Sequence, residues 1–149
     1  MSYPNPDLTL HPPRSARVRL GGYVILPRML DKGRALLAGK NGDYKFNGPL
    51  DKRFTDFAGI EGEALGEQLA AGKGDGEILE WIKANAANRP SDSAVVAWSA
   101  HQEQRAPGDV ETRNYFNQLH TEAAAHRKDI STWFDLLDLD DYTSYGGKA

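Results

Sequence analysis

The greatest concentration of side chains that could carry out chemistry lies between residues 14 and 34. Six basic residues and one acidic residue fall within this stretch: Arg14, Arg17, Arg19, Arg28, Asp31, Lys32 and Arg34. The guanidinium group is a planar fork that can hold a phosphate or a carboxylate through two parallel hydrogen bonds. The cluster therefore predicts non-catalytic binding of a small anionic ligand, or of an acidic patch on a partner protein.

Asp31 is the acidic residue inside this basic stretch. It lies three residues from both Arg28 and Arg34, a spacing that allows ion pairs on a helix, so we expect it to position the arginines. Tyr23 and Asp51 are expected to line the same pocket. The predicted ligand-binding residues are Arg14, Arg17, Arg19, Tyr23, Arg28, Asp31 and Arg34.

An enzyme is the main alternative. Either Arg28 or Arg34 would anchor an anionic substrate. The weak candidates for a catalytic acid or base are Asp31, Asp51 and His101. We favour the binding interpretation and leave catalysis open.

The distribution of charge leaves two further interpretations open. Residues 1–55 hold ten Lys and Arg against four Asp and Glu, whereas residues 56–149 hold eight against seventeen. The two parts could neutralise each other within one chain, for example where the basic residues dock against the acidic segment 129–141. They could also pair between two copies, so we expect a monomer or a homodimer.

Several classes of chemistry are excluded. The sequence has no cysteine, which removes disulfides, thiolate metal sites and a cysteine nucleophile. No two of its four histidines have the four-residue spacing that places metal ligands on one helix face. A net charge of −3 and poor aromatic interleaving argue against nucleic-acid binding. We therefore expect no metal, no cofactor and no nucleic-acid partner.

The length and the hydropathy pattern are typical of one cytoplasmic domain. The 149 residues match the size of an ordinary single domain, so we assign residues 1–149 to one. The apolar runs are far shorter than the roughly 20 residues of a membrane span. The first residues lack the basic and apolar regions of a signal peptide.

Apolar residues recur at helical spacing along most of the chain. The pattern predicts an all-α domain of about six helices, the clearest over residues 26–37. Four prolines make residues 1–20 an irregular basic arm. Alternation of polar and aromatic residues allows a short two-stranded hairpin near residues 43–54. The polar, glycine-rich tail at residues 142–149 is expected to be flexible.

Two segments of this basic region resemble a family signature. They read HPPRSARVRLGGY at residues 11–23 and LPRMLDKGRA at residues 26–35. Pro49-Leu50-Asp51 and the closing LDDY at residues 139–142, with Ser144 and Gly146-Gly147, are also similar. The family is a bacterial domain of unknown function, so the resemblance implies a single-domain bacterial protein and no particular activity.

Overall fold

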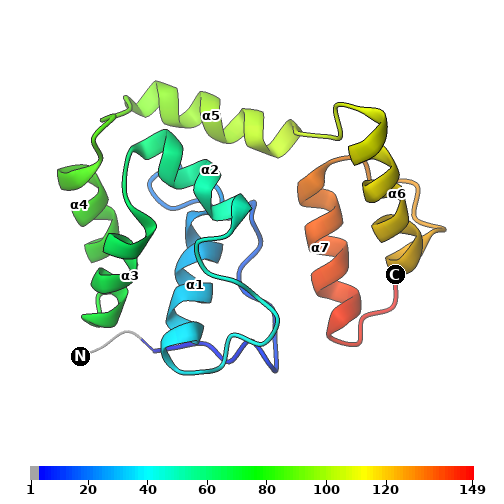
Figure 1. Ribbon diagram of the computed structural model, residues 1–149, viewed down its shortest axis with the longest axis horizontal. Helices are drawn as coiled ribbons and strands as arrows, with labels where there is room; N and C mark the ends of the chain where they lie inside the picture. The colour runs from blue at the N-terminus through cyan, green and yellow to red at the C-terminus, as the bar shows by residue number, and fades with distance from the viewer. Residues whose placement is uncertain (1–3) are drawn as a thin grey trace.

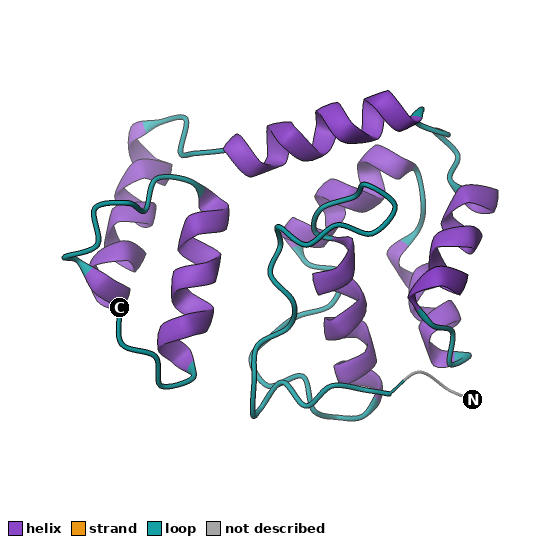
Figure 2. Ribbon diagram, turned by 180° about the vertical axis from the view of Figure 1, so that it is seen from behind, coloured by secondary structure: helices purple, strands orange, loops and turns teal. Residues whose placement is uncertain are grey.

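The chain forms seven α-helices over residues 4–149, the part that the computed structural model describes (Figure 1). Their bounds are α1 Leu26–Leu37, α2 Pro49–Ala58, α3 Gly62–Ala70, α4 Asp75–Asn85, α5 Asp92–Gln104, α6 Val110–Ala124 and α7 Trp133–Ser144. Figure 2 shows helices and loops and no strand. Within the described residues the one β-interaction is an isolated bridge between Leu20 and Tyr23. The expected all-α fold is confirmed. In the same part of the chain, no helix combines the length and apolarity needed to cross a lipid bilayer.

A tight turn at residues 20–23 leads the irregular arm into α1. Gly21 and Gly22 have φ values of 58° and 85°, which glycine adopts without strain. A Cβ on Gly21 would also lie 2.4 Å from a methyl group of Leu79. Pro27 then occupies the first turn of α1, where a helix does not need the missing N–H.

α1 is the central helix of the hydrophobic core. Leu26, Met29 and Leu30 are completely buried, and helices α2 and α3 pack against α1. Other large core residues come from α2, α3, α4 and α7: Phe54, Leu65, Ile78, Ile82 and Phe134. Burial of each such side chain contributes roughly 1.5–3 kcal/mol, so this cluster fixes where α1 presents its charged residues.

α6 and α7 form a second group of helices beside the α1–α4 part, and α5 runs across to join the two (Figure 1). The rings of Phe116 on α6 and Trp133 on α7 meet edge to face with centroids 5.2 Å apart. Side-chain caps begin both helices, from Asp109 and from Thr132. α7 is therefore a regular helix, and it lies beside the central helix α1 (Figure 1).

The short two-stranded hairpin that the sequence allows near residues 43–54 does not form. Residues 43–48 are turns and irregular backbone, and α2 begins at Pro49. Proline cannot donate a hydrogen bond to a strand ladder but suits the first turn of a helix. The segment that follows is a full helix, so the described residues form seven helices where about six were expected.

A hydrogen bond joins the N-terminal arm to the segment that follows α7, although the two ends of the described chain lie on opposite sides of the molecule (Figure 1). Residues 4–20 form an irregular arm, as expected. The tail begins later than expected, because α7 continues to Ser144. The hydroxyl of Tyr145 donates a hydrogen bond to the carbonyl oxygen of Leu8 at 2.5 Å, which ties the tail to the arm.

Candidate functional site

α1 presents its charged residues on two different faces. Arg28 and Lys32 are four residues apart, about 40° around the helix axis, and share one face. Asp31 and Arg34 share a second face. Arg28, Lys32 and Arg34 are only 3%, 6% and 1% exposed, so the surrounding structure must compensate three buried positive charges.

The second face of α1 joins the arm and α4 in an ionic network. Arg14 binds Asp31 through Nε at 3.0 Å and Nη2 at 2.9 Å, and it binds Asp75 through Nη1 at 2.8 Å. Arg34 donates from Nη1 to Asp75 at 2.7 Å. Asp75 is the first residue of α4, where the helix dipole also favours a negative charge. We call Arg14, Asp31, Arg34 and Asp75 the α4 network.

Hydrogen bonds favour the charged forms of Asp75 and Arg14 in the α4 network. Burial favours the neutral form of Asp75, but hydrogen bonds from Arg14 and Arg34 outweigh burial and hold its pKa below the usual value. Burial also opposes the charge of Arg14, yet its bonds to Asp31 and Asp75 raise its pKa above the ordinary value. The ion pairs of the network therefore connect the arm to α1 and α4.

The remaining arginines of the arm pair with acidic residues of α5 and α7. Arg17 donates from Nε to Asp138 at 3.0 Å and also contacts Asp135. Arg19 donates to Glu103 at 3.0 Å. The basic arm and the acidic C-terminal segment thus neutralise each other within one chain, as one of the interpretations of the charge distribution supposed.

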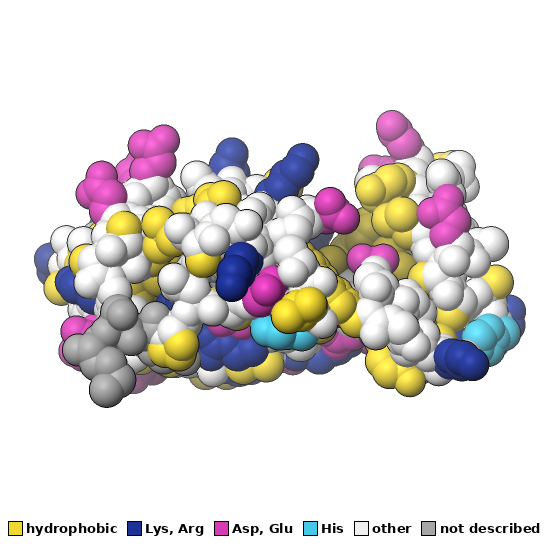
Figure 3. Space-filling view, turned by 90° about the horizontal axis from the view of Figure 1, so that it is seen from below, with side chains coloured by type: hydrophobic (Ala, Val, Ile, Leu, Met, Phe, Trp, Pro, Cys, Tyr) yellow, Lys and Arg dark blue, Asp and Glu magenta, His cyan; other side chains and the backbone are white. Residues whose placement is uncertain are grey.

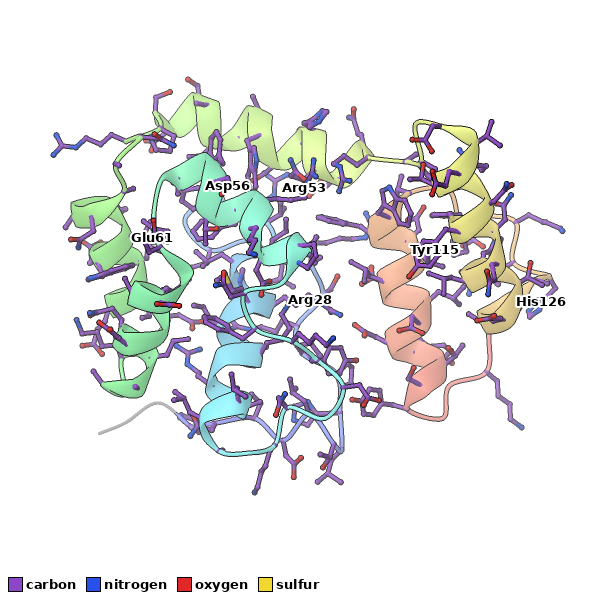
Figure 4. The ribbon with its side chains drawn as sticks, in the orientation of Figure 1. Arg28, Arg53, Asp56, Glu61, Tyr115 and His126 are labelled. Carbon is purple, nitrogen blue, oxygen red and sulfur yellow. The ribbon has the colours of Figure 1, made fainter. Side chains whose placement is uncertain are left out.

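The first face of α1 meets α2, α7 and the loop between α1 and α2. Arg28 donates from Nη1 to Asp141 at 2.7 Å and from Nη2 to its other oxygen at 3.3 Å. The hydroxyl of Tyr44 donates to the same carboxylate at 2.7 Å. Nζ of Lys32 lies 2.8 Å from Oδ1 of Asp51, which is completely buried. Figure 4 places Arg28 between α1 and α7.

A cavity of about 680 Å³ adjoins this face, a volume typical of small-molecule sites. Its lining includes Arg28, Lys32, Tyr44, Lys45, Leu50, Leu137, Asp140 and Tyr145. Seen from below, the surface is hollowed between the α1–α4 part and the α6–α7 part (Figure 3). Hydrophobic side chains line this hollow and acidic side chains stand at its rim. The cavity therefore combines an apolar wall with two buried cations.

Three side chains that line the cavity, Lys32, Tyr44 and Asp140, have displaced pKa values. Burial lowers the pKa of Lys32, and its ion pair with Asp51 offsets this only in part. Burial and the neighbouring carboxylate of Asp141 raise the pKa of Asp140. Burial and the hydrogen bond to Asp141 raise the pKa of Tyr44, which stays a hydroxyl donor at neutral pH. Displaced pKa values in a concave site are typical of ligand-binding and catalytic sites.

The structure does not gather the predicted ligand-binding residues around one cavity. Of that set, Arg28 lines the 680 Å³ cavity. Tyr23 instead packs in the core, with its ring 4.9 Å from that of Phe54 and edge to face with it. The others belong to the α4 network or to the pairs of the arm: Arg14, Arg17, Arg19, Asp31 and Arg34.

The three candidate acid–base residues are also separated. Asp31 is held by Arg14 in the α4 network. Asp51 is buried against Lys32, beside the cavity. His101 lies exposed on α5. Of these three residues, only Asp51 contacts a side chain that lines the cavity, namely Lys32.

Sequence reasoning missed two residues that line the cavity, Tyr44 and Tyr145, and the carboxylate of Asp141, which binds Arg28 and Tyr44. Tyr44 lies in the loop where the sequence allows a hairpin, Asp141 precedes the tail expected at residues 142–149, and Tyr145 lies within it. Lys32 was counted in the basic cluster, but the four-residue spacing from Arg28 was not used. That spacing was the available signal, because it sets both cations on one helix face.

In residues 4–149, no three His, Asp or Glu side chains are grouped so that they could hold a metal ion.

The sequence of this chain matches a known protein family. The model of a domain of unknown function, DUF5069, matches residues 10–143. The chain belongs to the DUF5069 family. The matched range of this DUF5069 protein contains Arg28, Lys32, Tyr44, Asp51 and Asp141, so the ionic groups beside the cavity fall inside the family domain. No curated protein matches the chain.

Proposed function

We propose that this protein binds a small organic molecule that carries a carboxylate or phosphate group in the cavity between α1 and α7. The observation that supports this most strongly is that two buried cations, Arg28 and Lys32, line one cavity of metabolite size. Burial of a charge costs free energy unless the charge is paired, and each of these cations has a carboxylate partner and still borders the cavity.

Both cations can bind an acid group while they keep their partners. The guanidinium of Arg28 has five N–H groups, and its hydrogen bonds within the described residues are three: two to Asp141 and one to the carbonyl of Arg14. The ammonium of Lys32 has three N–H groups and one partner carboxylate, Asp51. Donors on both side chains are therefore available to a ligand.

The charged residues at the rim of the cavity indicate which functional groups a ligand would carry. Lys45 adds a third positive charge, whereas Asp43 and Asp140 add carboxylates. An acid group would lie toward Arg28 and Lys32, and a hydroxyl or amino group of the same ligand would donate to a rim carboxylate. The recessed shape suits a small molecule better than the flat acidic patch of a partner protein, which was the other expected occupant.

Thermal unfolding in the presence of small anions tests the proposal. The probes are inorganic phosphate, pyruvate, lactate and citrate, each against the unmodified protein and three variants. A ligand at one hundred times its Kd stabilises the folded state by about 2.7 kcal/mol, which raises the midpoint of unfolding. We expect at least one probe to do so.

The variants locate the effect. Lys45→Ala removes the exposed cation at the rim, and Arg28→Lys keeps a charge but loses the planar fork, so both should weaken the stabilisation. Lys52→Ala removes an exposed lysine of α2 outside the cavity and should leave it unchanged. Absence of stabilisation by every probe, or an equal effect in all variants, would overturn the proposal.

A further inference from the structure

The amino group of Lys32 is unusual among the polar groups beside the cavity because it is a nucleophile when neutral. Its side chain is 7% exposed and lines the cavity. Burial disfavours the ammonium form and lowers the pKa of Lys32, with Asp51 opposing that effect. A desolvated lysine of this kind is the group that forms imines with carbonyl compounds.

Asp51 is placed to move protons for such a reaction. Its Oδ1 lies 2.8 Å from Nζ of Lys32, and its side chain is completely buried, so bulk water does not compete for the proton. Its other oxygen accepts a hydrogen bond from the backbone N–H of Asn47 at 2.8 Å, which fixes the orientation of the carboxylate. The ion pair is thus a rigid acid–base pair at the wall of the cavity.

Arg28 supplies the second half of a binding site for a carbonyl acid. It lies one helical turn before Lys32 on the same face, so the two groups can meet two functional groups of one small molecule. The charged groups that face Lys32 come from three helices: Arg28 of α1, Asp51 of α2 and Asp141 of α7. Asp141 is already bound to Arg28, which leaves Asp51 as the proton partner of Lys32.

We propose that the ligand is an oxo acid and that Lys32 forms a reversible imine with its carbonyl carbon, while Arg28 binds its acid group. This inference rests on the proposed function, because it names the ligand class of the same cavity. It adds a covalent step to the binding proposed above.

The reaction balances without any further reagent. The ammonium of Lys32 gives one proton to Asp51, and the nitrogen lone pair attacks the carbonyl carbon as the C=O π bond breaks. A proton passes from nitrogen to the carbonyl oxygen and gives a carbinolamine. Asp51 then returns its proton to the hydroxyl group, the C–O bond breaks, and water leaves. The product is a protonated imine on Lys32 opposite the Asp51 carboxylate, so the pair keeps its charge throughout.

Reductive trapping tests this step. The full-length protein is incubated with pyruvate and cyanoborohydride, which reduces an imine to a stable amine, and each lysine is then examined by peptide mass spectrometry. The other seven lysines of the sequence serve as internal controls. We expect labelling of Lys32 to exceed that of the exposed Lys45 and Lys52 several-fold, because the cavity holds the carbonyl carbon beside the Lys32 amine.

Three variants distinguish a loss of imine formation from a loss of folding, because trapping and thermal unfolding are measured for each. Lys32→Arg keeps the ion pair with Asp51 but cannot form an imine, so trapping at this site should be lost while thermal unfolding changes little. Asp51→Asn keeps the amine and removes the proton carrier, so trapping should slow about a hundredfold or more. Lys52→Ala should behave as the unmodified protein. If Lys32→Arg does not fold, the labelling pattern of the unmodified protein decides the matter.

The outcomes distinguish this inference from the proposed function. Stabilisation by pyruvate without preferential labelling of Lys32 would overturn the imine and leave anion binding standing. Equal labelling of all exposed lysines, with Lys32 no higher, would also overturn it. Labelling of Lys32 that is blocked by inorganic phosphate would support both the imine and the shared site.

Discussion

Arg28 and Asp141 are 113 positions apart in the sequence, yet Nη1 of Arg28 lies 2.7 Å from Oδ2 of Asp141 and both side chains are buried. Tyr44 donates to the same carboxylate. This contact joins α1, the loop after it and α7, which together form the wall of the cavity. The pair therefore holds the cavity wall together and also contributes to the stability of the fold.

Breaking this pair from one side should destabilise the protein strongly. Arg28→Met leaves the buried carboxylate of Asp141 without its cation, and Asp141→Asn leaves the buried guanidinium without its anion. Each change should lower the free energy of unfolding by about 3–5 kcal/mol, the usual cost of an uncompensated buried charge. Urea denaturation measures both variants.

The double variant Arg28→Met/Asp141→Leu is the control for that prediction. It removes both charges and replaces them with apolar groups, so it should recover much of the lost stability. The outcome that contradicts this interpretation is a double variant no more stable than the singles, or single variants that cost less than about 1 kcal/mol, the level of an exposed pair.

Asp75 should make stability depend on pH in the acid range. Its pKa is lowered in the folded protein because hydrogen bonds from Arg14 and Arg34 outweigh burial. The stabilisation is therefore complete above the unfolded pKa of about 3.9 and is lost as the pH falls through the lower folded value. Asp75→Asn should cost about 1.5–3 kcal/mol at neutral pH.

Unfolding measured from pH 7 to pH 2 checks this prediction. The difference in stability between the unmodified protein and Asp75→Asn should shrink as the pH falls below 4. A difference that is constant across the range would show that Asp75 does not carry the acid sensitivity.

The turn at residues 20–23 should not tolerate a side chain at its first glycine. Gly21→Ala places a Cβ at positive φ and 2.4 Å from Leu79, so it should cost at least about 1–2 kcal/mol. Gly76→Ala is the matched control, because Gly76 lies in α4 with open space around it and alanine favours helix. Thermal unfolding should rank Gly76→Ala at or above the unmodified protein and Gly21→Ala clearly below it.

The charge distribution along the chain should not cause self-association. Arg17 pairs with Asp138, and Arg19 with Glu103, inside one chain, so the complementary charges are already used. We expect light scattering to give the mass of a monomer at low and at high salt. A dimer at low salt that dissociates at high salt would instead favour pairing between copies.

The helical fold could be predicted because its signals are local. Pro27, the apolar spacing of α1 and the caps at Ser91 and Asp109 are each read within a few residues of sequence. The hairpin was mispredicted for the same reason. The polar–aromatic stretch at residues 43–46 resembles a strand locally, but Pro49 and the packing of Phe54 in the core favour a helix in the segment that follows.

The candidate site could be predicted only in part, because its contacts are distant in sequence. Arg28 stands out in a basic cluster, but that Asp141 and Tyr44 meet it depends on how α7 packs. A cluster of arginines close together in sequence does not converge when a helix turns Arg34 about 120° away from Arg28. Spacing within α1 could identify Lys32 as the neighbour of Arg28, and no local pattern could identify Asp51 as its partner.

The most direct test of the cavity as a ligand site is a nuclear magnetic resonance titration of the ¹⁵N-labelled protein with pyruvate and, separately, with inorganic phosphate. The account predicts saturable shifts confined to the amides around the cavity, at Tyr44, Lys45, Asp140 and Tyr145. No saturable shift with either probe, or shifts centred on Arg17 and Arg19 at the surface of the arm, would contradict it.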